Sequence, residues 1–373
     1  MIIAIDCFKL IKGVGKSIGI YNVALNIVRE LSGHMKTHPE DKNTLVVFGN
    51  SENRRDFEQE NTEFYEIKGL NPRNKLHCVC WELFAVSCYC RKVRADRILY
   101  PRGYCSLFHP CRDYVLIHDM IPFYYNKNHP GYFNRLENAY ITNRLRASAA
   151  SAHKIITISE ASKKDIISIC RVKEEKISVI YNLINPENAS DNMPPIENRD
   201  YICAITSALP HKNAAGILKS YESYCRRCSQ PLPLKVIGIE DTDEFLKLEE
   251  KVKEKISCIK YIKDNREFSS LIAGSRIFLF LSLIEGFGLP PIEAMQLRVP
   301  VICSDIPSLK EVAGDAALLV NPMDPEQAAS ALLLLTDEDK ECEKLIEKGC
   351  ENIKRFLQPA NSLSFTKLLL NEK

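Results

Sequence analysis

The segment EGFGLPPIEAM (285–295) places two glutamates on either side of a glycine turn. Gly286 and Gly288 allow the backbone to approach a ligand closely, and the helix expected after them offers free N–H groups and a partial positive charge, which suits a diphosphate. Glu293 is expected in the first turn of that helix, where its carboxylate could bind the two vicinal hydroxyls of a ribose. Glu285, at the end of a strand, would point toward the group attached to the phosphate. A glycine-rich turn with an acid that complements the helix dipole is the structural alternative.

Three more side chains could take part in the same chemistry. Lys212 lies at an expected helix start, where a cation is unfavourable beside the helix dipole, so an anionic partner is favoured. His118 ends a buried strand, where a structural role fits as well as a catalytic one. Asp119 beside it could orient the imidazole ring or cap the next turn. No metal site is expected, because no Asp-x-Asp stands in a metal-binding context and the cysteines lack the spacing of a zinc site.

The elements that would position these residues are short β-branched strands alternating with amphipathic helices. Most of the strands are apolar on both faces, which is typical of parallel strands covered by helices on each side. The pattern predicts an α/β fold with two doubly wound parallel sheets. Because ligands of such sheets bind beyond the carboxyl ends of the strands, two facing sheets would hold a substrate in the cleft between them. The expected strands are 2–6, 44–49, 97–101, 114–119, 154–159, 177–182, 201–206, 234–239, 259–263, 277–282, 300–305 and 316–320.

The chain of 373 residues divides at a linker that is rich in proline and poor in apolar residues. We expect a first domain at 1–183, a linker at 184–200, a second domain at 201–350 and a C-terminal helix within 351–373 that packs back on the first domain.

Residues 1–183 hold 27 Lys and Arg against 19 Asp and Glu, whereas the remainder is acidic. With 45% hydrophobic and 26% charged residues, disorder and coiled coil are excluded. The absence of a long apolar run or a signal-like start predicts a cytoplasmic chain with reduced thiols.

The glutamate pair and several further segments resemble the retaining glycosyltransferases of the GT-B fold, in the glycogen-synthase-like group called family 4. The E-x7-E motif of that group matches Glu285 and Glu293, and the resemblance covers nearly the whole chain. It implies two Rossmann-like domains, the first binding the acceptor and the second binding the nucleotide sugar. The other matching segments are KGVGKSIGIYN (12–22), IHDMIPFYY (117–125), ITISEASKKDI (156–166), SALPHKN (207–213), YIKDNREFSSLIAGS (261–275) and 299–325.

The resemblance also implies a role for each matching residue. Lys212 would hold the donor diphosphate and stabilise the negative charge that grows on it, His118 would contact the transferred sugar near its anomeric carbon, and Glu285 would complete the catalytic set. Configuration would be retained by front-face attack, with no bound metal and no cofactor beyond the nucleotide sugar. The other donor-binding residues would be Gly19, Ser207, His211, Ile262, Gly286, Phe287, Gly288, Leu289 and Glu293, and the acceptor side would include Tyr21, Arg102 and Asp119.

Two positions depart from the pattern of the family. Ser17 stands where the glycine-rich loop has its first glycine, and His211 replaces the arginine of an Arg-Lys pair. Histidine is largely neutral at pH 7 and cannot make the bidentate contact of arginine, so phosphate binding could be weaker or sensitive to pH. A non-catalytic nucleotide-sugar-binding paralogue therefore stays an alternative. An epimerase of nucleotide sugars is a second one, which the E-x7-E wording disfavours.

The first domain indicates what the acceptor could be. Residues 71–112 carry eight Lys and Arg against two acids, with aromatic residues between them. Such a surface suits a lipid-linked saccharide at an anionic membrane, although a solvated charged face explains it equally well. Nucleic acid is not expected as a partner. We expect a hexosyltransferase of bacterial surface polysaccharide synthesis at the inner face of the cytoplasmic membrane. Mannose from GDP-mannose is preferred, because the first domain resembles mannosyl- and rhamnosyltransferases of O-antigen assembly.

Overall fold

The computed structural model describes residues 1–13, 18–184, 194–357 and 364–371. The chain folds into two compact units, each with its own parallel sheet. The first comprises Met1–Tyr181 and the C-terminal helix, and the second extends from Asn182 to Ala360. The α/β class with two doubly wound sheets, predicted from the sequence, is confirmed. None of the helices in the described ranges is long and apolar enough to cross a membrane.

The sheet of the first unit has seven strands in the order β3-β2-β1-β4-β5-β6-β7, and every neighbouring pair is parallel. The order runs outward from β1 in both directions, so the carboxyl ends of β1 and β4 lie at the switch point of the sheet. The strands are β1 (Ile2–Asp6), β2 (Thr44–Gly49), β3 (Thr62–Glu66), β4 (Arg97–Tyr100), β5 (Arg112–Leu116), β6 (Lys154–Thr157) and β7 (Ile177–Val179).

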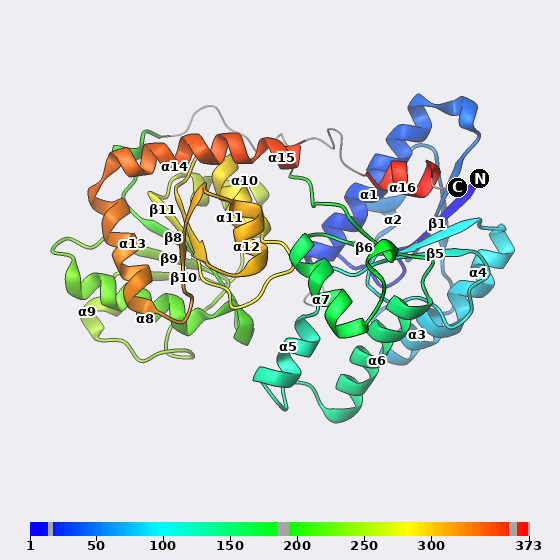
Figure 1. The fold of residues 1–373 in the computed structure, drawn as a ribbon, viewed down its shortest axis with the longest axis horizontal. Helices are drawn as coiled ribbons and strands as arrows, with labels where there is room; N and C mark the ends of the chain where they lie inside the picture. Colours follow the sequence, from blue (N-terminus) through cyan, green and yellow to red (C-terminus); the bar gives the residue numbers. More distant parts are fainter. Residues whose placement is uncertain (14–17, 185–193, 358–363, 372–373) are drawn as a thin grey trace. The chain divides into compact units, whose positions relative to one another are not determined.

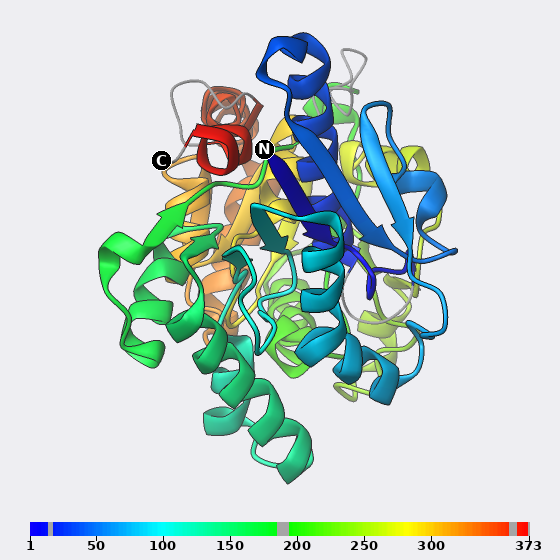
Figure 2. The ribbon, with the colours of Figure 1, turned by 90° about the vertical axis from the view of Figure 1, so that its right-hand side faces the viewer.

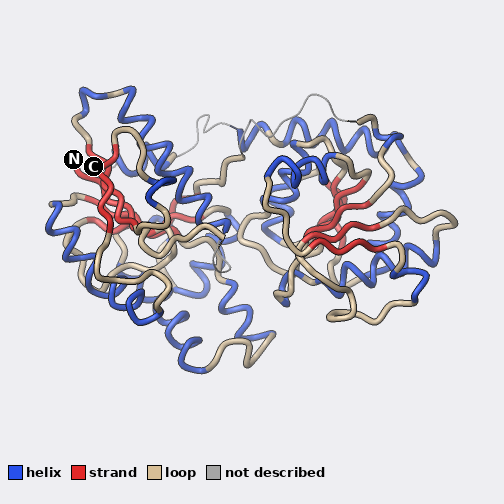
Figure 3. Tube along the Cα trace, turned by 180° about the vertical axis from the view of Figure 1, so that it is seen from behind, coloured by secondary structure: helices blue, strands red, loops and turns tan. Residues whose placement is uncertain are grey.

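Helices cover both faces of this sheet, as Figures 1 and 3 show. Buried residues of α4, α6 and α7 form one core with residues of the strands. Buried residues of α1 lie next to α16 and β2. Figure 2 shows α5 and α6 side by side, extending away from the sheet. The helices are α1 (Ile18–Thr37), α2 (Arg54–Phe57), α3 (Lys75–Cys80), α4 (Val86–Val93), α5 (Ile121–Asn128), α6 (Arg135–Ser151), α7 (Glu160–Cys170) and α16 (Phe365–Asn371), with a π-helical turn at Trp81–Ala85.

The C-terminal helix α16 belongs to the first unit and lies along α1. Arg97, which is 6% exposed, donates from Nη1 to the carbonyl oxygen of Leu369 at 2.7 Å. At the start of the helix, the N–H of Thr366 donates to Glu30 Oε1 at 2.9 Å. These bonds supply partners for a buried guanidinium and for one free N–H of the helix end, and so tie α16 to the sheet and to α1.

The sheet of the second unit has six parallel strands in the order β10-β9-β8-β11-β12-β13. Figures 1 and 3 show α8 and α13 on one face of this sheet and α10, α11 and α12 on the other. The strands are β8 (Ile202–Ile205), β9 (Leu234–Ile237), β10 (Ile256–Ile259), β11 (Ile277–Phe280), β12 (Val301–Ser304) and β13 (Ala317–Val320). The helices are α8 (Ala214–Arg227), α9 (Glu250–Lys253), α10 (Asn265–Ala273), α11 (Leu289–Gln296), α12 (Pro307–Ala313), α13 (Pro325–Asp337), α14 (Asp339–Asn352) and α15 (Lys354–Leu357).

Two of the strand predictions were wrong, and both concern edge strands. The strand β3 was missed, because its sequence TEFYE carries two acids and an edge strand needs no continuous apolar run. The strand β10 was expected at 259–263 but occupies Ile256–Ile259, where Ser257 is exposed. The expected run shares only Ile259 with the observed strand, and the rest of it forms the loop after the strand. Several central strands also end earlier than expected, so that His118 lies in the loop that follows β5.

Candidate functional site

The second sheet has its switch point between β8 and β11, where the strand order reverses. From β8 the chain proceeds to β9 and β10 on one side, and from β11 to β12 and β13 on the other. Ligands of doubly wound sheets bind outside the carboxyl ends of the strands at such a point. The loops that follow β8 and β11 contain Lys212 and Glu285, so the topology brings these two predicted catalytic residues to one edge of the sheet.

Hydrogen bonds to backbone carbonyl oxygens hold these two loops against each other. The side chain of Asn213 donates from Nδ2 to the carbonyl oxygen of Leu281 at 2.9 Å. The N–H of Leu283 donates to the carbonyl oxygen of His211 at 2.7 Å. Asn213 also caps α8 by accepting from the N–H of Gly216, and its φ of 55° is a left-handed conformation that asparagine tolerates well. The position of Lys212 is therefore set by its neighbours on both sides.

Lys212 and Glu285 form an ion pair, with 2.5 Å between Nζ and Oε1. Their side chains are 25% and 11% exposed, so the pair is largely buried but open on one side. The ammonium also lies 5.5 Å from the centroid of the Phe280 ring. A lysine ammonium has three N–H donors, and Glu285 occupies one of them. The remaining donors could bind phosphate oxygens without breaking the ion pair, which is the chemistry expected of Lys212.

The glycine turn between Glu285 and α11 requires glycine at 288. Gly288 has φ 106° and is the N-cap of the helix. A Cβ atom there would lie 2.2 Å from Leu309 Cδ2, so a side chain is disfavoured by both conformation and space. Pro290 and Pro291 occupy the first turn, as expected. Because proline has no N–H, this helix end offers the backbone donors of Gly288 and Leu289 rather than a full set of four.

The expectation that Glu293 lies in the first turn of α11 was wrong. The helix begins at Leu289 and has no acid in its first turn, so Glu293 lies one turn further along. Helical side chains lean toward the N-terminus, which directs Glu293 back toward the glycine turn. Burial raises the pKa of this carboxyl to about 7. Near neutral pH it can therefore donate as well as accept a hydrogen bond, which suits contact with ligand hydroxyls.

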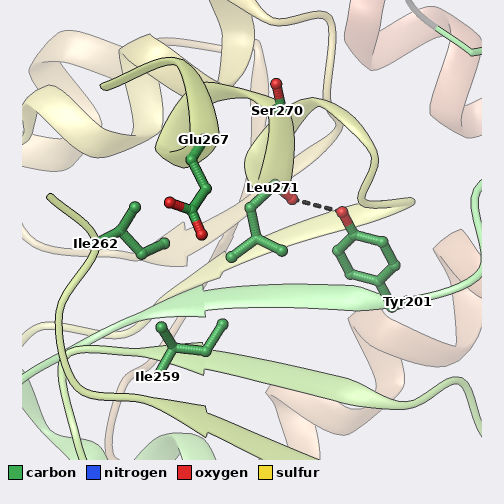
Figure 4. A pocket seen from close by; sticks show the side chains of 6 residues that line it. All are labelled: Tyr201, Ile259, Ile262, Glu267, Ser270 and Leu271. Carbon is green, nitrogen blue, oxygen red and sulfur yellow. Dashed lines mark hydrogen bonds between the residues drawn. The ribbon is translucent and has the colours of Figure 1, made fainter. Parts of the chain in front are cut away.

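The other predicted donor-binding residues lie in different surroundings. Phe287 is 3% exposed and packs edge-on against Phe356, so its side chain supports the turn from behind. The hydroxyl of Ser207 accepts from the N–H of Leu209 at 3.3 Å. His211 is 5% exposed, so its side chain is buried. Ile262 lies in the loop after β10 and lines a cavity (Figure 4).

In the first unit, His118 lies just beyond the carboxyl end of β5. Its Nε2 is 2.8 Å from the carbonyl oxygen of Pro101, which can only accept, so Nε2 carries the proton. Burial lowers the pKa of His118 to about 4, and the charge of Arg102 adds to this effect. The ring is therefore neutral near pH 7, with Nδ1 as an acceptor. Asp119 accepts at Oδ1 from the N–H of Ile121 at 3.0 Å, which is the capping role of the two that the sequence allowed.

The other residues of the first unit that were predicted to bind donor or acceptor lie in different environments. The hydroxyl of Tyr21 donates to Asp56 at 2.6 Å and the residue is 2% exposed, which fits core packing better than contact with an acceptor. Gly19 is the second residue of α1 rather than part of a loop, and a Cβ atom there would meet nothing within 4 Å. Ser17 lies outside the described residues. Arg102 donates from Nη1 to the carbonyl oxygen of Lys9 at 3.5 Å, and its buried Nε has no hydrogen-bond partner in the described ranges.

A buried charged cluster beside Arg102 was missed by the sequence analysis. Glu82 is 3% exposed and pairs with Lys9 at 3.0 Å, and the hydroxyl of Tyr140 donates to its other oxygen at 2.7 Å. Lys9 follows β1, so the cluster lies at the same edge of the sheet as Arg102. No spacing in the sequence connects these positions. The available signal was Glu82 itself, a single acid within the apolar stretch WELFA.

Comparison with known proteins places the chain among sugar transferases. Residues 44–188 match the family described as Glycosyltransferase Family 4, and residues 187–352 match the family described as Glycosyl transferases group 1. The two matches adjoin and together cover most of the chain. They include the segments that contain His118, Lys212, Glu285 and Glu293.

Two relatives of the chain carry the name O-antigen chain mannosyltransferase. The chain is 34% identical over 223 residues to O-antigen chain mannosyltransferase RfbU of Salmonella typhimurium, which covers 58% of this chain and 59% of that protein. It is 28% identical to O-antigen chain mannosyltransferase B of Escherichia coli, over 71% of this chain and 76% of that protein. The matched part of the chain thus spans less than two thirds of the RfbU length.

Solved structures share the fold over nearly the full chain. WaaG, a glycosyltransferase involved in lipopolysaccharide biosynthesis, superposes with a TM-score of 0.69 at 14% identity, covering 98% of this chain and 97% of that one. Sucrose-phosphate synthase from Thermosynechococcus elongatus gives 0.70 at 15% identity, covering 96% and 95%. At these identities the likeness supports the two-sheet fold alone.

Proposed function

The chain belongs to the family 4, group 1 glycosyltransferases, and from that premise we propose that it transfers a hexose from a nucleotide-diphosphate sugar to a saccharide acceptor. The names of the relatives favour mannose as the sugar and surface polysaccharide, such as O-antigen, as the product. The whole activity, its donor and its acceptor are part of this proposal.

The ion pair of Lys212 with Glu285 is the observation that carries the proposal. Both residues follow strands at the switch point of the second sheet, where the topology favours ligand binding. The lysine would bind the diphosphate of the donor and stabilise the charge that develops as the glycosidic bond breaks. The N–H groups of Gly288 and Leu289 would share this task. These groups could balance the charge of the leaving diphosphate, so we propose transfer without a metal ion.

The proton of the acceptor hydroxyl needs a destination in this mechanism. We assign it to the departing phosphate on the same face of the sugar, which gives retention of configuration. The neutral ring of His118, with Nε2–H held by Pro101, presents Nδ1 as an acceptor for a sugar hydroxyl. Arg102 and the Glu82–Lys9 pair lie at the carboxyl edge of the first sheet and are the proposed contacts of the acceptor.

Membrane contact is the part of the proposal that rests on the first unit. Leu76 is 77% exposed and Leu136 is 85% exposed. Their chain neighbours Lys75 and Glu137 form an ion pair at 3.8 Å between the starts of α3 and α6. Exposed leucines with lysine beside them suit an anionic bilayer, where each basic residue contributes about 1 kcal/mol. The acceptor would then be lipid-linked, at the inner face of the cytoplasmic membrane. Flotation with vesicles of phosphatidylglycerol, and loss of flotation in Leu76→Ser/Leu136→Ser, tests this.

A donor panel tests the function itself. Thermal unfolding is followed with GDP, UDP, dTDP and their sugars, with and without EDTA. A ligand at 100 times its Kd stabilises the fold by about 2.7 kcal/mol. A shift with one nucleotide that EDTA does not change supports a metal-independent donor site. Release of nucleoside diphosphate that depends on added acceptor distinguishes a transferase from an epimerase, and absence of any shift supports the non-catalytic alternative.

A further inference from the structure

The strand β5 ends at Leu116, two residues before His118. The main-chain bonds between β5 and β6, its neighbour in the sheet (Figure 1), extend to the N–H of Ile117, which donates to the carbonyl oxygen of Ile156 at 2.9 Å. A carbonyl group that packs against a neighbouring element needs a hydrogen-bond donor. Beyond the end of the strand, the donors for the next two carbonyl groups have to come from outside the regular sheet.

Two hydroxyl groups of the segment 156–166 supply these donors. Thr157, the last residue of β6, donates from Oγ1 to the carbonyl oxygen of Ile117 at 2.8 Å. Ser162, in the first turn of α7, donates from Oγ to the carbonyl oxygen of His118 at 3.0 Å. The two residues are 0% and 3% exposed, so water does not compete for either bond. Side-chain donors thus continue the contact of β5 with its neighbour as far as His118.

The bond made by Ser162 differs from the usual bond of a helical serine. Serine hydroxyls commonly bond to the backbone of their own helix, as Ser168 of α7 does with the carbonyl oxygen of Asp165 at 3.1 Å. Ser162 instead reaches a residue 44 positions earlier in the chain. Its own main chain is fixed by the helix cap, because its N–H donates to Ser159 Oγ at 3.0 Å. The hydroxyl is therefore a rigid support for the loop after β5.

His118 is held at two points, one on its ring and one on its main chain. The ring donates from Nε2 to the carbonyl oxygen of Pro101 at 2.8 Å, and the main chain accepts from Ser162. The residue is partly exposed, so the ring can meet a ligand. Without the hydroxyl of Ser162, the peptide group that follows His118 loses its donor and can rotate, and the direction of Nδ1 changes with it. A displacement of about 1 Å in a catalytic contact can cost about 100-fold in rate.

We infer that Ser162 is a positioning residue for sugar transfer, whose hydroxyl fixes the main chain of His118 so that Nδ1 of the ring meets a hydroxyl of the transferred sugar. This inference rests on the proposed function, in which His118 contacts the sugar. Ser162 acts only through His118, so two consequences follow. Its loss affects the sugar and leaves the nucleotide alone, and its loss has no effect when the imidazole ring is absent.

The experiment compares wild type, Ser162→Ala, Ser162→Thr and Ser168→Ala. Turnover of GDP-mannose, UDP-glucose and dTDP-rhamnose is followed by release of the nucleoside diphosphate, and calorimetry gives the Kd of that nucleoside diphosphate. Ser162→Ala lowers kcat by about 10- to 100-fold, whereas the Kd changes by less than about twofold. Ser162→Thr keeps a hydroxyl and recovers most of the turnover. Ser168 is exposed on the same helix, and Ser168→Ala behaves as wild type.

A second comparison introduces Ser162→Ala into His118→Ala. Two residues that act as a unit give non-additive effects, so the double variant has the same kcat as His118→Ala. An equal loss from Ser162→Ala in both backgrounds would overturn the inference.

Three other outcomes would also overturn it. They are a kcat of Ser162→Ala within twofold of wild type, a Kd for the nucleoside diphosphate that weakens in step with kcat, and a Ser162→Thr variant that binds the nucleoside diphosphate but is as slow as Ser162→Ala. The threonine variant keeps the test decisive even where alanine impairs folding. In each of these cases the transferase proposal stands. If wild type consumes none of the three donors, the proposed function fails and this inference fails with it.

Discussion

Replacing Lys212 with methionine separates the contribution of its ion pair with Glu285 to stability from its proposed role in catalysis. The change keeps the length of the side chain and removes the ammonium. It leaves the Glu285 carboxylate, which is 11% exposed, without its partner at 2.5 Å. Breaking a fully buried pair costs about 3–5 kcal/mol, and the 25% exposure of Lys212 allows water to compensate in part. We expect Lys212→Met to lower the free energy of unfolding by about 1–2 kcal/mol, below that buried-pair cost.

The effect on catalysis should be larger than the effect on stability. Loss of one preorganised group that stabilises developing charge typically costs about 100- to 1,000-fold in kcat. The double variant Lys212→Met/Glu285→Gln then distinguishes the two effects. Replacing the unpaired carboxylate with an amide should recover most of the lost stability, because the buried charge is gone. It should recover no activity, because the cation is still absent.

Urea unfolding and acceptor-dependent release of nucleoside diphosphate measure the two quantities on the same preparations. With the single variant Glu285→Gln, these proteins form a double-mutant cycle, in which the coupling of Lys212 with Glu285 should be favourable for stability. Two results would refute this reasoning. One is a loss of less than about threefold in kcat for Lys212→Met, far below the factor expected for a charge-stabilising group. The other is recovery of activity together with stability in the double variant, which would mean that Lys212 acts through the fold alone.

Further predictions concern the pH dependence of stability and the glycine turn. Burial raises the pKa of Glu293 to about 7, so the folded state holds a proton that the unfolded state has lost, and stability should fall as pH rises from about 4.5 to 7; Glu293→Gln should remove this slope in urea unfolding at pH 5 and 8. The pKa of His118 is lowered to about 4, so its contribution has the opposite sign and stability should fall as pH drops from about 6.5 to 4; His118→Asn should flatten that acid limb. Gly288→Ala should cost about 1–3 kcal/mol in thermal unfolding because of its φ of 106°, whereas Gly19→Ala, placed in α1, should be neutral or slightly stabilising.

The fold was predictable where strands are buried on both faces. The central strands of both sheets are runs of apolar residues with almost no exposure, such as IFLF in β11, and this pattern is visible in the sequence. The edge strands β3 and β10 carry polar residues on a solvated face, so their pattern resembles a loop or shifts the expected position. The same reasoning explains why strand ends were placed too late, because the loops after β5 and β11 begin with buried residues.

The site was predictable only where the signal is local. The glycine turn with Glu285, the prolines and Gly288 is one continuous segment, and its conformation follows from residue types that few backbones tolerate. Glu293 was expected in the first turn of α11, but the helix begins at Leu289 and its first turn ends before Glu293. The neutral state of His118 follows from burial, which a strand pattern alone does not reveal.

The sequence by itself determined the two parallel sheets and the glycine turn, since periodicity and backbone preference act over a few neighbouring residues. Only the tertiary structure decided which of those residues meet. Lys212 and Glu285 come together because β8 and β11 are neighbours in the sheet, and Glu82 meets Lys9 and Tyr140 through three separate elements. Ser162 reaches the carbonyl oxygen of His118 because β5 and β6 are neighbouring strands. Strand order and helix packing follow from the burial of the whole apolar surface, and no local pattern encodes them.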